Sequence, residues 1–248
     1  MILTRSIHMY LRRSPFWFAV VCTVLACAAP GRPAPGPRPV VVAELKPLAD
    51  SARWSAELRA FAHTDSVTPP PAAPVLFVGS SSIRKWESLT ADFPSLPVLN
   101  RGFGGSRMDD VLRYADRVVF RYHPRAIVLY EGDNDLLEGR SPARIAGDVA
   151  EFLGRVRTTL PMTRVICIGV KPSPSRWNLV DKVRETNSLL EAIVTRDTMA
   201  TFVDVFTPML GANGRPRPEL FLSDSLHMMP AGYVIWRDAV APALRAMR

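Results

Sequence analysis

Four short stretches of the chain hold side chains that could carry out chemistry together. Three serines occupy positions 80–82, directly after the apolar run VLFVG, and Asp224 stands three residues before His227. A serine on a tight turn between a strand and a helix exposes its hydroxyl, and it can offer its own backbone N–H to a developing oxyanion. The Asp-x-x-His spacing lets the carboxylate orient the imidazole, whose other nitrogen can then accept the serine proton. These residues therefore predict a nucleophile, an orienting group and a base for acyl transfer.

The two stretches between them could supply hydrogen-bond donors. Gly105 lies in the loop NRGFGGS at 100–106, where glycines let backbone N–H groups approach a ligand. Asn134 lies in EGDND at 131–135, and a neutral amide can stabilise an oxyanion without adding charge to the resting site. A phosphate-cradling loop is an alternative for the first stretch, although no Walker-type Lys-Ser/Thr pair follows it. A cation site is an alternative for the second, but acids in such positions are more often caps and solvated charges. We expect no metal and no cofactor.

All four stretches fall at or beyond the ends of predicted elements. Short apolar runs predict strands at 75–79, 97–100, 126–132, 164–170 and 201–205. Apolar residues at helical spacing predict helices near 107–121, 141–158, 178–196 and 230–246. Strands that alternate with helices indicate a parallel sheet with right-handed crossovers. We expect an α/β fold, a three-layer α/β/α sandwich of flavodoxin-like type with a five-stranded parallel sheet in the order 2-1-3-4-5. Its ligand should bind beyond the carboxyl ends of the strands, where the strand order reverses.

The same four stretches resemble the sequence blocks of the SGNH (GDSL-type) hydrolases. FVGSSSI is similar to the first block with Ser81 as the nucleophile, and NRGFGGS to the second with Gly105. EGDND is similar to the third block with Asn134, and DSLH to the fifth with Asp224 and His227. The blocks occur in the family's order and are spread over residues 75–233. All four in order make a highly specific match, whereas any one of them alone would be weak.

One position departs from the family pattern, and it bears on the choice of nucleophile. Ser80 stands where the family usually has an aspartate, and Ser82 follows Ser81, so either neighbour could also be proposed. The register with the family's FVGDS pattern favours Ser81. The resemblance implies a serine esterase that works through an acyl-enzyme, with the oxyanion held by the N–H groups of Ser81 and Gly105 and by the Asn134 amide.

The substrate is less well specified than the reaction. Members of the family cleave acetyl groups from carbohydrates, acyl chains from lysophospholipids, thioesters and simple esters. No long apolar segment suggests a lipase lid, which favours a short acyl group or an acetyl group, with lysophospholipase or thioesterase activity as the alternative. The loop at 171–177 could form a pocket wall that uses Lys171 and Trp177, although Trp177 could equally pack on the sheet.

Two readings from other functional classes compete with the enzyme. A cell-envelope binding module could keep the fold without turnover, but the matched serine, aspartate and histidine argue against it. Nucleic-acid binding is suggested by the net charge of +8, from 31 basic and 23 acidic residues, yet no basic run interleaved with aromatic residues is present. Removing the three arginines of residues 1–26 lowers the charge from +8 to +5, so part of the excess belongs to the N-terminal leader.

The N-terminal leader has the layout of a secretory signal peptide. Arginines precede an apolar run at 16–29 that is too short to span a membrane as a helix. Val24 to Cys27 resembles a bacterial lipobox, in which Cys27 would be lipidated and become the mature N-terminus, while simple cleavage after Ala26 or Ala28 is the alternative. We expect a signal peptide at 1–26, a Pro-rich tether at 27–40, a helical extension at 41–67 and the hydrolase domain at 75–248. The protein is expected in the periplasm or cell envelope, with a small-molecule or glycan ester as its substrate.

Composition and cysteine use agree with one exported globular domain. The 248 residues are 48% hydrophobic and 22% charged, which suffices for one sizeable core. The helical extension carries apolar residues at helical spacing, including Trp54, Leu58 and Phe61. Beyond the signal region, which holds Cys22 and Cys27, Cys167 in the apolar run RVICIGV is the one remaining cysteine, so we predict a packing residue there and no internal disulfide.

Overall fold

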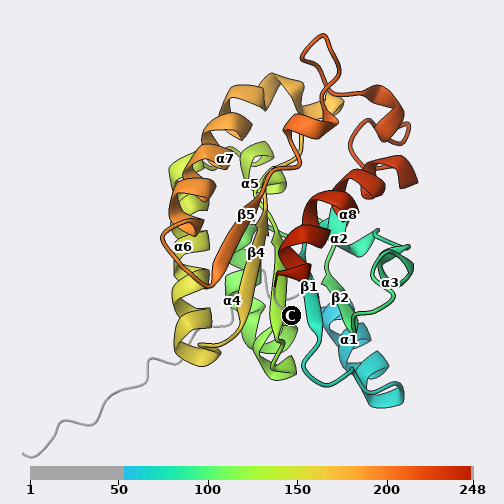
Figure 1. Ribbon diagram of the computed structural model, residues 1–248, viewed down its shortest axis with the longest axis vertical. Helices are drawn as coiled ribbons and strands as arrows, with labels where there is room; N and C mark the ends of the chain where they lie inside the picture. The colour runs from blue at the N-terminus through green and yellow to red at the C-terminus, as the bar shows by residue number, and fades with distance from the viewer. Residues whose placement is uncertain (1–52, 247–248) are drawn as a thin grey trace, which may run out of the picture. The chain divides into compact units, whose positions relative to one another are not determined.

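A computed structural model describes residues 53–246 of the chain (Figure 1). The predicted signal peptide, Cys27, the tether and the first part of the helical extension lie outside the described residues. Among residues 53–246, no helix is long and apolar enough to cross a bilayer.

Five parallel strands form one sheet in the order β2-β1-β3-β4-β5, which confirms the predicted topology. The strands are β1 (Val75–Gly79), β2 (Val98–Gly102), β3 (Ala126–Tyr130), β4 (Arg164–Ile168) and β5 (Ala200–Val203). β1 and β3 are buried along their whole length, because helices cover both faces of the sheet. Gly79 is level with Gly102 and with Tyr130, so β1, β2 and β3 end together and their following loops meet at one edge.

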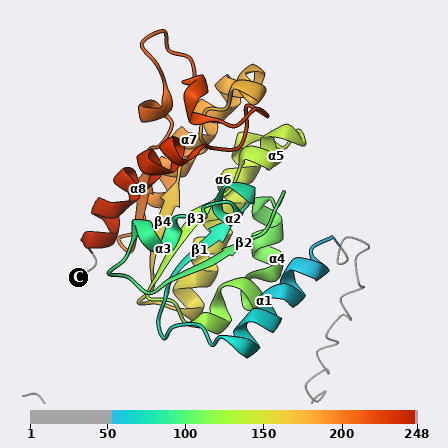
Figure 2. The same ribbon diagram turned by 90° about the vertical axis from the view of Figure 1, so that its right-hand side faces the viewer.

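Side chains at alternate strand positions point to opposite faces of the sheet, and each face has its own apolar core. One core combines Leu76, Val78 and their neighbours with α1 (Ser55–Val67), α4 (Met108–Val118), α6 (Pro142–Thr159) and α7 (Val180–Val194). The other core lies on the opposite face, against α2 (Ser81–Arg84), α3 (Leu89–Asp92) and α8 (Pro230–Arg245). Figure 2 shows α8 and α3 on one side of the sheet and α4 and α1 on the other. This arrangement is the expected three-layer sandwich.

Several short elements at the strand ends complete the fold. They are α5 (Asp133–Leu137) and the 3₁₀ turns η2 (Phe120–Tyr122), η3 (Pro174–Leu179), η4 (Thr207–Met209) and η5 (Pro218–Leu220). β3 ends at Tyr130, two residues before the predicted end, and EGDND therefore forms a turn and the start of α5 rather than the end of a strand. Cys167 is buried in β4, where burial raises the pKa of its thiol to about 12, as fits a packing residue.

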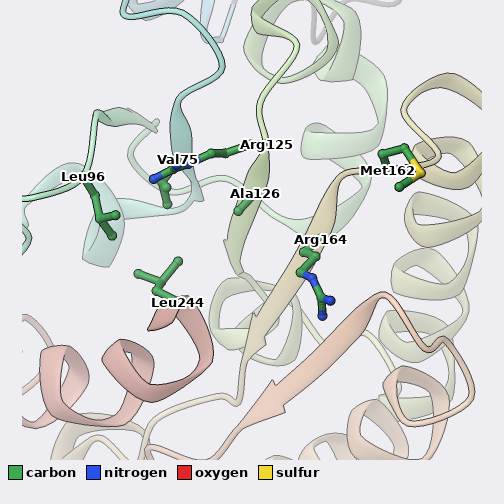
Figure 3. A pocket seen from close by; sticks show the side chains of 7 residues that line it. All are labelled: Val75, Leu96, Arg125, Ala126, Met162, Arg164 and Leu244. Atoms are coloured by element: carbon green, nitrogen blue, oxygen red, sulfur yellow. The ribbon is translucent and has the colours of Figure 1, made fainter. Parts of the chain in front are cut away.

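The opposite, amino edge of the sheet has a cavity of about 210 Å³ (Figure 3). Val75, Ala126 and Arg164 line it from the starts of three strands, and Leu244 lines it from the end of α8. This cavity lies at the far end of the strands from the loops that follow them, and it contains none of the predicted site residues.

Candidate active site

The carboxyl edge of the sheet brings together Ser81, His227 and Asp224. Ser81 is the first residue of α2, directly after β1, and the other two lie in the loop before α8. The Ser81 Oγ atom is 3.0 Å from Nε2 of His227, and Nδ1 of His227 is 2.6 Å from Oδ2 of Asp224. Both distances are those of hydrogen bonds. Although 146 residues separate Ser81 from His227 in sequence, the two hydrogen bonds connect Ser81, His227 and Asp224 in one continuous series.

The Asp224 carboxylate is organised by its own turn. Its Oδ1 atom accepts hydrogen bonds from the backbone N–H groups of Leu226 and His227, both at 2.9 Å, as in an Asx turn. Ser225 adopts a left-handed conformation with φ of 56°, and the Leu222 N–H donates to the carbonyl of His227 at 2.7 Å. The hydrogen bond from His227 is the main cause that lowers the pKa of Asp224 below its ordinary value. An ionised Asp224 holds the Nδ1–H of His227, which leaves Nε2 free to accept a proton.

Burial distinguishes the three consecutive serines. Ser80 and Ser82 are only 2% and 3% exposed, whereas Ser81 is half-buried with its hydroxyl toward the imidazole. Gly79 precedes this turn with φ of 143°, and a Cβ atom at this position would lie 2.0 Å from the carbonyl oxygen of Tyr130. Only glycine fits there, because β1 and β3 approach so closely at this point.

The two predicted donor residues lie in adjacent loops that are hydrogen-bonded to each other. Gly105, with φ of 78°, lies between β2 and α4, and Asn134 is the second residue of α5. The Asn134 Nδ2 atom donates to the carbonyl oxygen of Ser106 at 2.9 Å. Its Oδ1 atom accepts from Nη2 of Arg176 at 3.1 Å. These two contacts fix the orientation of the side-chain amide, with its nitrogen toward the Gly105–Ser106 loop.

Lys171 does not form the predicted pocket wall. Its side chain is 1% exposed, and Nζ contacts Oδ2 of Asp133 at 2.5 Å and the hydroxyl of Tyr130 at 3.3 Å. Arg176 contacts the other oxygen of Asp133 at 2.5 Å. Burial by itself would raise the pKa of Asp133, but the charges and hydrogen bonds of Lys171 and Arg176 outweigh it and lower the pKa. The prediction of Lys171 as a substrate contact is therefore corrected, because its ammonium group neutralises a buried carboxylate instead.

Trp177 lies in η3, in the loop between β4 and α7, and is half-buried. One side of it packs against the small apolar cluster that includes Leu136 and Val170. The guanidinium of Arg215 lies over its ring, 5.0 Å from the ring centre. Packing on the body of the protein and partial exposure thus occur together in this side chain.

The remaining acids of EGDND are engaged with protein groups. Glu131 accepts a hydrogen bond from the Ser106 hydroxyl at 2.6 Å, and burial raises its pKa well above the ordinary value. Asp135 accepts from the backbone N–H of Met108, the first residue of α4, at 3.2 Å. In the part of the chain that the structure describes, no group of three His, Cys, Asp or Glu side chains is placed to hold a metal ion.

Two contacts at this edge were not anticipated from the sequence. Arg176 lies within the loop singled out at 171–177, but its contact with Asn134 joins residues 42 positions apart. Trp54, noted only for its helical spacing, donates a hydrogen bond from Nε1 to the carbonyl oxygen of Gly104 at 3.0 Å. No sequence signal marks either contact, because each depends on how loops from different strands meet.

Comparisons with known proteins agree with this fold. The candidate acylhydrolase of Bacteroides fragilis is 22% identical, with a TM-score of 0.68 over 78% of this chain and 99% of that one. A GDSL-like lipase of Bacteroides thetaiotaomicron is 21% identical, with a TM-score of 0.66 over 78% of this chain and 99% of that one. An acetylxylan esterase of Geobacillus stearothermophilus is 15% identical, with a TM-score of 0.57 over 71% of this chain and 94% of that one. At these identities the likeness shows the fold alone. No curated protein matches the chain in sequence.

The family assignment comes from the sequence itself. Residues 65–235 match the model of the GDSL-like lipase/acylhydrolase family, a segment that includes all five strands and the loops that carry Ser81, Gly105, Asn134, Asp224 and His227. The matched segment is well over half of the 248 residues. The chain therefore belongs to the GDSL-like lipase/acylhydrolase family and is a hydrolase of ester bonds.

Proposed function

We propose that the protein is a serine esterase that removes a short acyl group, foremost an acetyl group, through a covalent acyl-enzyme. One observation carries the proposal: the Ser81 hydroxyl lies 3.0 Å from Nε2 of His227, and Asp224 binds the opposite ring nitrogen at 2.6 Å. A nucleophile, a base and an orienting carboxylate in direct contact are what acyl transfer to serine requires.

Acylation and deacylation use the same base. His227 accepts the Ser81 proton as Oγ forms a bond to the acyl carbon, and it then returns that proton to the departing alcohol as the ester C–O bond breaks. A water molecule next gives its proton to His227 while its oxygen attacks the acyl-Ser81 ester, and the proton passes back to Oγ as the carboxylic acid leaves. Asp224 stays ionised throughout and stabilises the transient imidazolium.

Three donors would hold the oxyanion of the tetrahedral intermediate. They are the backbone N–H groups of Ser81 and Gly105 and the side-chain Nδ2 of Asn134. The contact between Asn134 Nδ2 and the Ser106 carbonyl at 2.9 Å supports this role, because it directs the amide nitrogen toward the Gly105 loop. Removal of one such donor typically costs about 3 kcal/mol of transition-state stabilisation.

We infer a small acyl group and a glycan or small-molecule alcohol as the two halves of the ester. One of the similar structures is named an acetylxylan esterase, and that name concerns that protein alone. In this chain, the half-buried Trp177 follows Arg176, which contacts the Asn134 amide, so a partly exposed aromatic side chain stands in the same loop as that contact.

A chain-length series tests the reaction and the nucleophile together. We would assay p-nitrophenyl esters from acetate to dodecanoate and an acetylated xylo-oligosaccharide with the wild type and with Ser81→Ala. Ser81→Ala should lose activity on every ester, whereas Ser82→Ala, whose side chain is buried, should retain most of it. A fluorophosphonate probe should label the wild type at Ser81, as read by peptide mass spectrometry. Unchanged acetate hydrolysis by Ser81→Ala would refute the proposal, and a preference for long chains would replace the short-acyl assignment with a lipase-like one.

We also propose that the protein is exported and tethered to the cell envelope through a lipidated Cys27. The proposal stands on the arginine-led apolar leader and the Pro-rich stretch at 27–40. Mass spectrometry of the mature N-terminus tests it: a diacylglycerol mass on Cys27 is expected, and an unmodified start after Ala26 or Ala28 would replace the tether with simple secretion.

A further inference from the structure

A tryptophan from the N-terminal extension contacts the loop that carries Gly105. Trp54 directly precedes α1 and is 1% exposed. Its Nε1 atom donates a hydrogen bond to the carbonyl oxygen of Gly104 at 3.0 Å. Edge-to-face contacts hold the indole in place, with ring centres 5.7 Å from Phe103 and 6.4 Å from Tyr114. The indole is thus held rigidly, and its one polar atom donates its hydrogen bond to this loop.

The carbonyl that Trp54 binds belongs to the same peptide unit as the N–H of Gly105. A trans peptide is planar, so its C=O and its N–H point in opposite directions. Holding the Gly104 oxygen therefore fixes the direction of the Gly105 N–H. The restraint matters here because two consecutive glycines give this peptide unusual freedom to rotate, and Gly105 has φ of 78°. A hydrogen bond to the carbonyl also polarises the peptide, which makes its N–H a stronger donor.

We propose that Trp54 is a positioning residue that directs the Gly105 N–H toward the oxyanion of the ester-hydrolysis reaction. The inference rests on the proposed function, because it concerns one of the three proposed oxyanion donors. Trp54 precedes the segment 65–235 that matches the family. The extension thus contributes to the site from outside the family segment.

A neighbouring residue reinforces the same loop. Nη2 of Arg53 donates to the carbonyl oxygen of Gly105 at 3.3 Å, and its guanidinium lies over the Trp54 ring, 4.4 Å from the ring centre. The side chains of Trp54 and Arg53 therefore hold two consecutive peptides of the loop. The contact of Arg53 is more exposed, so the buried indole is the stronger restraint.

The extension is anchored separately at its other end, which makes the test possible. Asp65, near the end of α1, forms a buried ion pair with Arg101 of β2 and accepts a hydrogen bond from the Tyr122 hydroxyl at 2.7 Å. Leu58, in the middle of α1, is 3% exposed and packs in the apolar core. Removing the indole N–H should therefore leave α1 docked, and a change at Leu58 can weaken the docking while the indole N–H remains.

The experiment compares two replacements at Trp54 with a packing control. Trp54→Phe removes the donor, and replacement of Trp54 by 3-benzothienylalanine removes it while keeping the two-ring shape. Both should lower kcat for p-nitrophenyl acetate about 3- to 10-fold, the loss expected for one neutral hydrogen bond, with KM within about twofold. Binding of phenylboronic acid, which forms a tetrahedral adduct with the nucleophile, should weaken by the same factor. Leu58→Ala should lower the melting temperature and leave kcat of the folded protein unchanged.

Three results would overturn the inference or the function beneath it. Wild-type kcat and boronate affinity in the benzothienylalanine protein would show that the donor does not position the loop. A fall in kcat for Leu58→Ala equal to that for Trp54→Phe would assign the effect to general packing, and would also overturn the inference. Ser81→Ala, assayed in the same series, distinguishes failure of the proposed function from failure of the Trp54 inference. If Ser81→Ala keeps full activity, the proposed function fails and the inference fails with it. If Ser81→Ala is inactive, the Trp54 variants alone decide the inference.

Discussion

Replacement of Asp135 by asparagine should change how stability depends on pH. Asp135 is fully buried in α5, where both carboxylate oxygens lie within 3.3 Å of the backbone nitrogen of Met108. Nη1 of Arg140 is 3.9 Å away. Three effects compete at this carboxylate: burial favours the neutral form, while the N–H at the start of α4 and the arginine favour the charged form. Burial dominates, and it raises the pKa of Asp135 from 3.8 to about 6.

The sign and size of the effect follow from linkage. Because the folded protein binds this proton more tightly than the unfolded chain, Asp135 contributes stability at low pH that is lost as pH rises through about 6. The rise in pKa corresponds to about 3 kcal/mol in full, at 1.36 kcal/mol for each pH unit. Asparagine keeps one acceptor oxygen for the Met108 N–H and does not titrate. The free energy of unfolding of the wild type relative to Asp135→Asn should therefore fall by about 2.5 kcal/mol between pH 4 and pH 8.

Urea unfolding at several pH values between 4 and 8 measures this difference. Glu131 is present in both proteins, but the charge of Asp135 is one of the causes that raise its pKa, so the measured difference also includes the loss of this coupling. Asp116→Asn, at an exposed position of α4, is the matched control for the loss of one carboxylate. A wild type that gains stability relative to Asp135→Asn as pH rises would refute the reasoning, because it would mean that the Met108 N–H and Arg140 outweigh burial.

Three further predictions concern single contacts. Asp224→Asn should lower kcat for p-nitrophenyl acetate at least about 100-fold. One carboxylate oxygen accepts from backbone N–H groups and the other from His227, whereas an amide has only one oxygen. Steady-state kinetics, with circular dichroism to show that the fold is unchanged, measure the effect. Gly79→Ala should destabilise the fold by about 3 kcal/mol or more, because its Cβ would lie 2.0 Å from the Tyr130 carbonyl oxygen, and soluble yield and urea unfolding measure the loss. Cys167 should resist a thiol reagent at pH 8 in the folded protein and react in guanidinium, since burial raises its pKa to about 12; fast reaction of the folded protein would contradict its burial.

The fold could be predicted from the sequence wherever an element is long enough to show a period. The buried strands are short apolar runs, and the helices α4, α6, α7 and α8 each span at least 11 residues, so their spacing was visible. The helices α2, α3 and α5 have four or five residues, little more than one turn, and cannot show helical periodicity. Their positions depend instead on the loops that leave the ends of the strands.

In the candidate site, too, the residue types could be predicted from the sequence, but their exposure and their partners could not. Ser81 and its two serine neighbours are chemically identical, and their different exposure arises only when α2 packs on the sheet. Lysine is rarely fully buried, so a surface role for Lys171 was the natural expectation. Its burial depends on Asp133, which lies 38 residues earlier, at the start of α5 and just beyond the neighbouring strand β3. A pairing of that kind is fixed by strand order and register, which no local pattern encodes.

The register also explains how three acids can lie beside a proposed oxyanion. Ionised carboxylates close to a developing negative charge would repel it, and EGDND places three of them around Asn134. Asp133 lies between Lys171 and Arg176, so its charge is more than balanced by two cations. Glu131 is shifted toward its neutral form by burial, and Asp135 faces the N–H at the positive end of α4. Arg176 then connects this balanced group to the oxygen of the Asn134 amide, so an arginine that neutralises Asp133 also helps to orient the amide, whose nitrogen faces the Ser106 carbonyl.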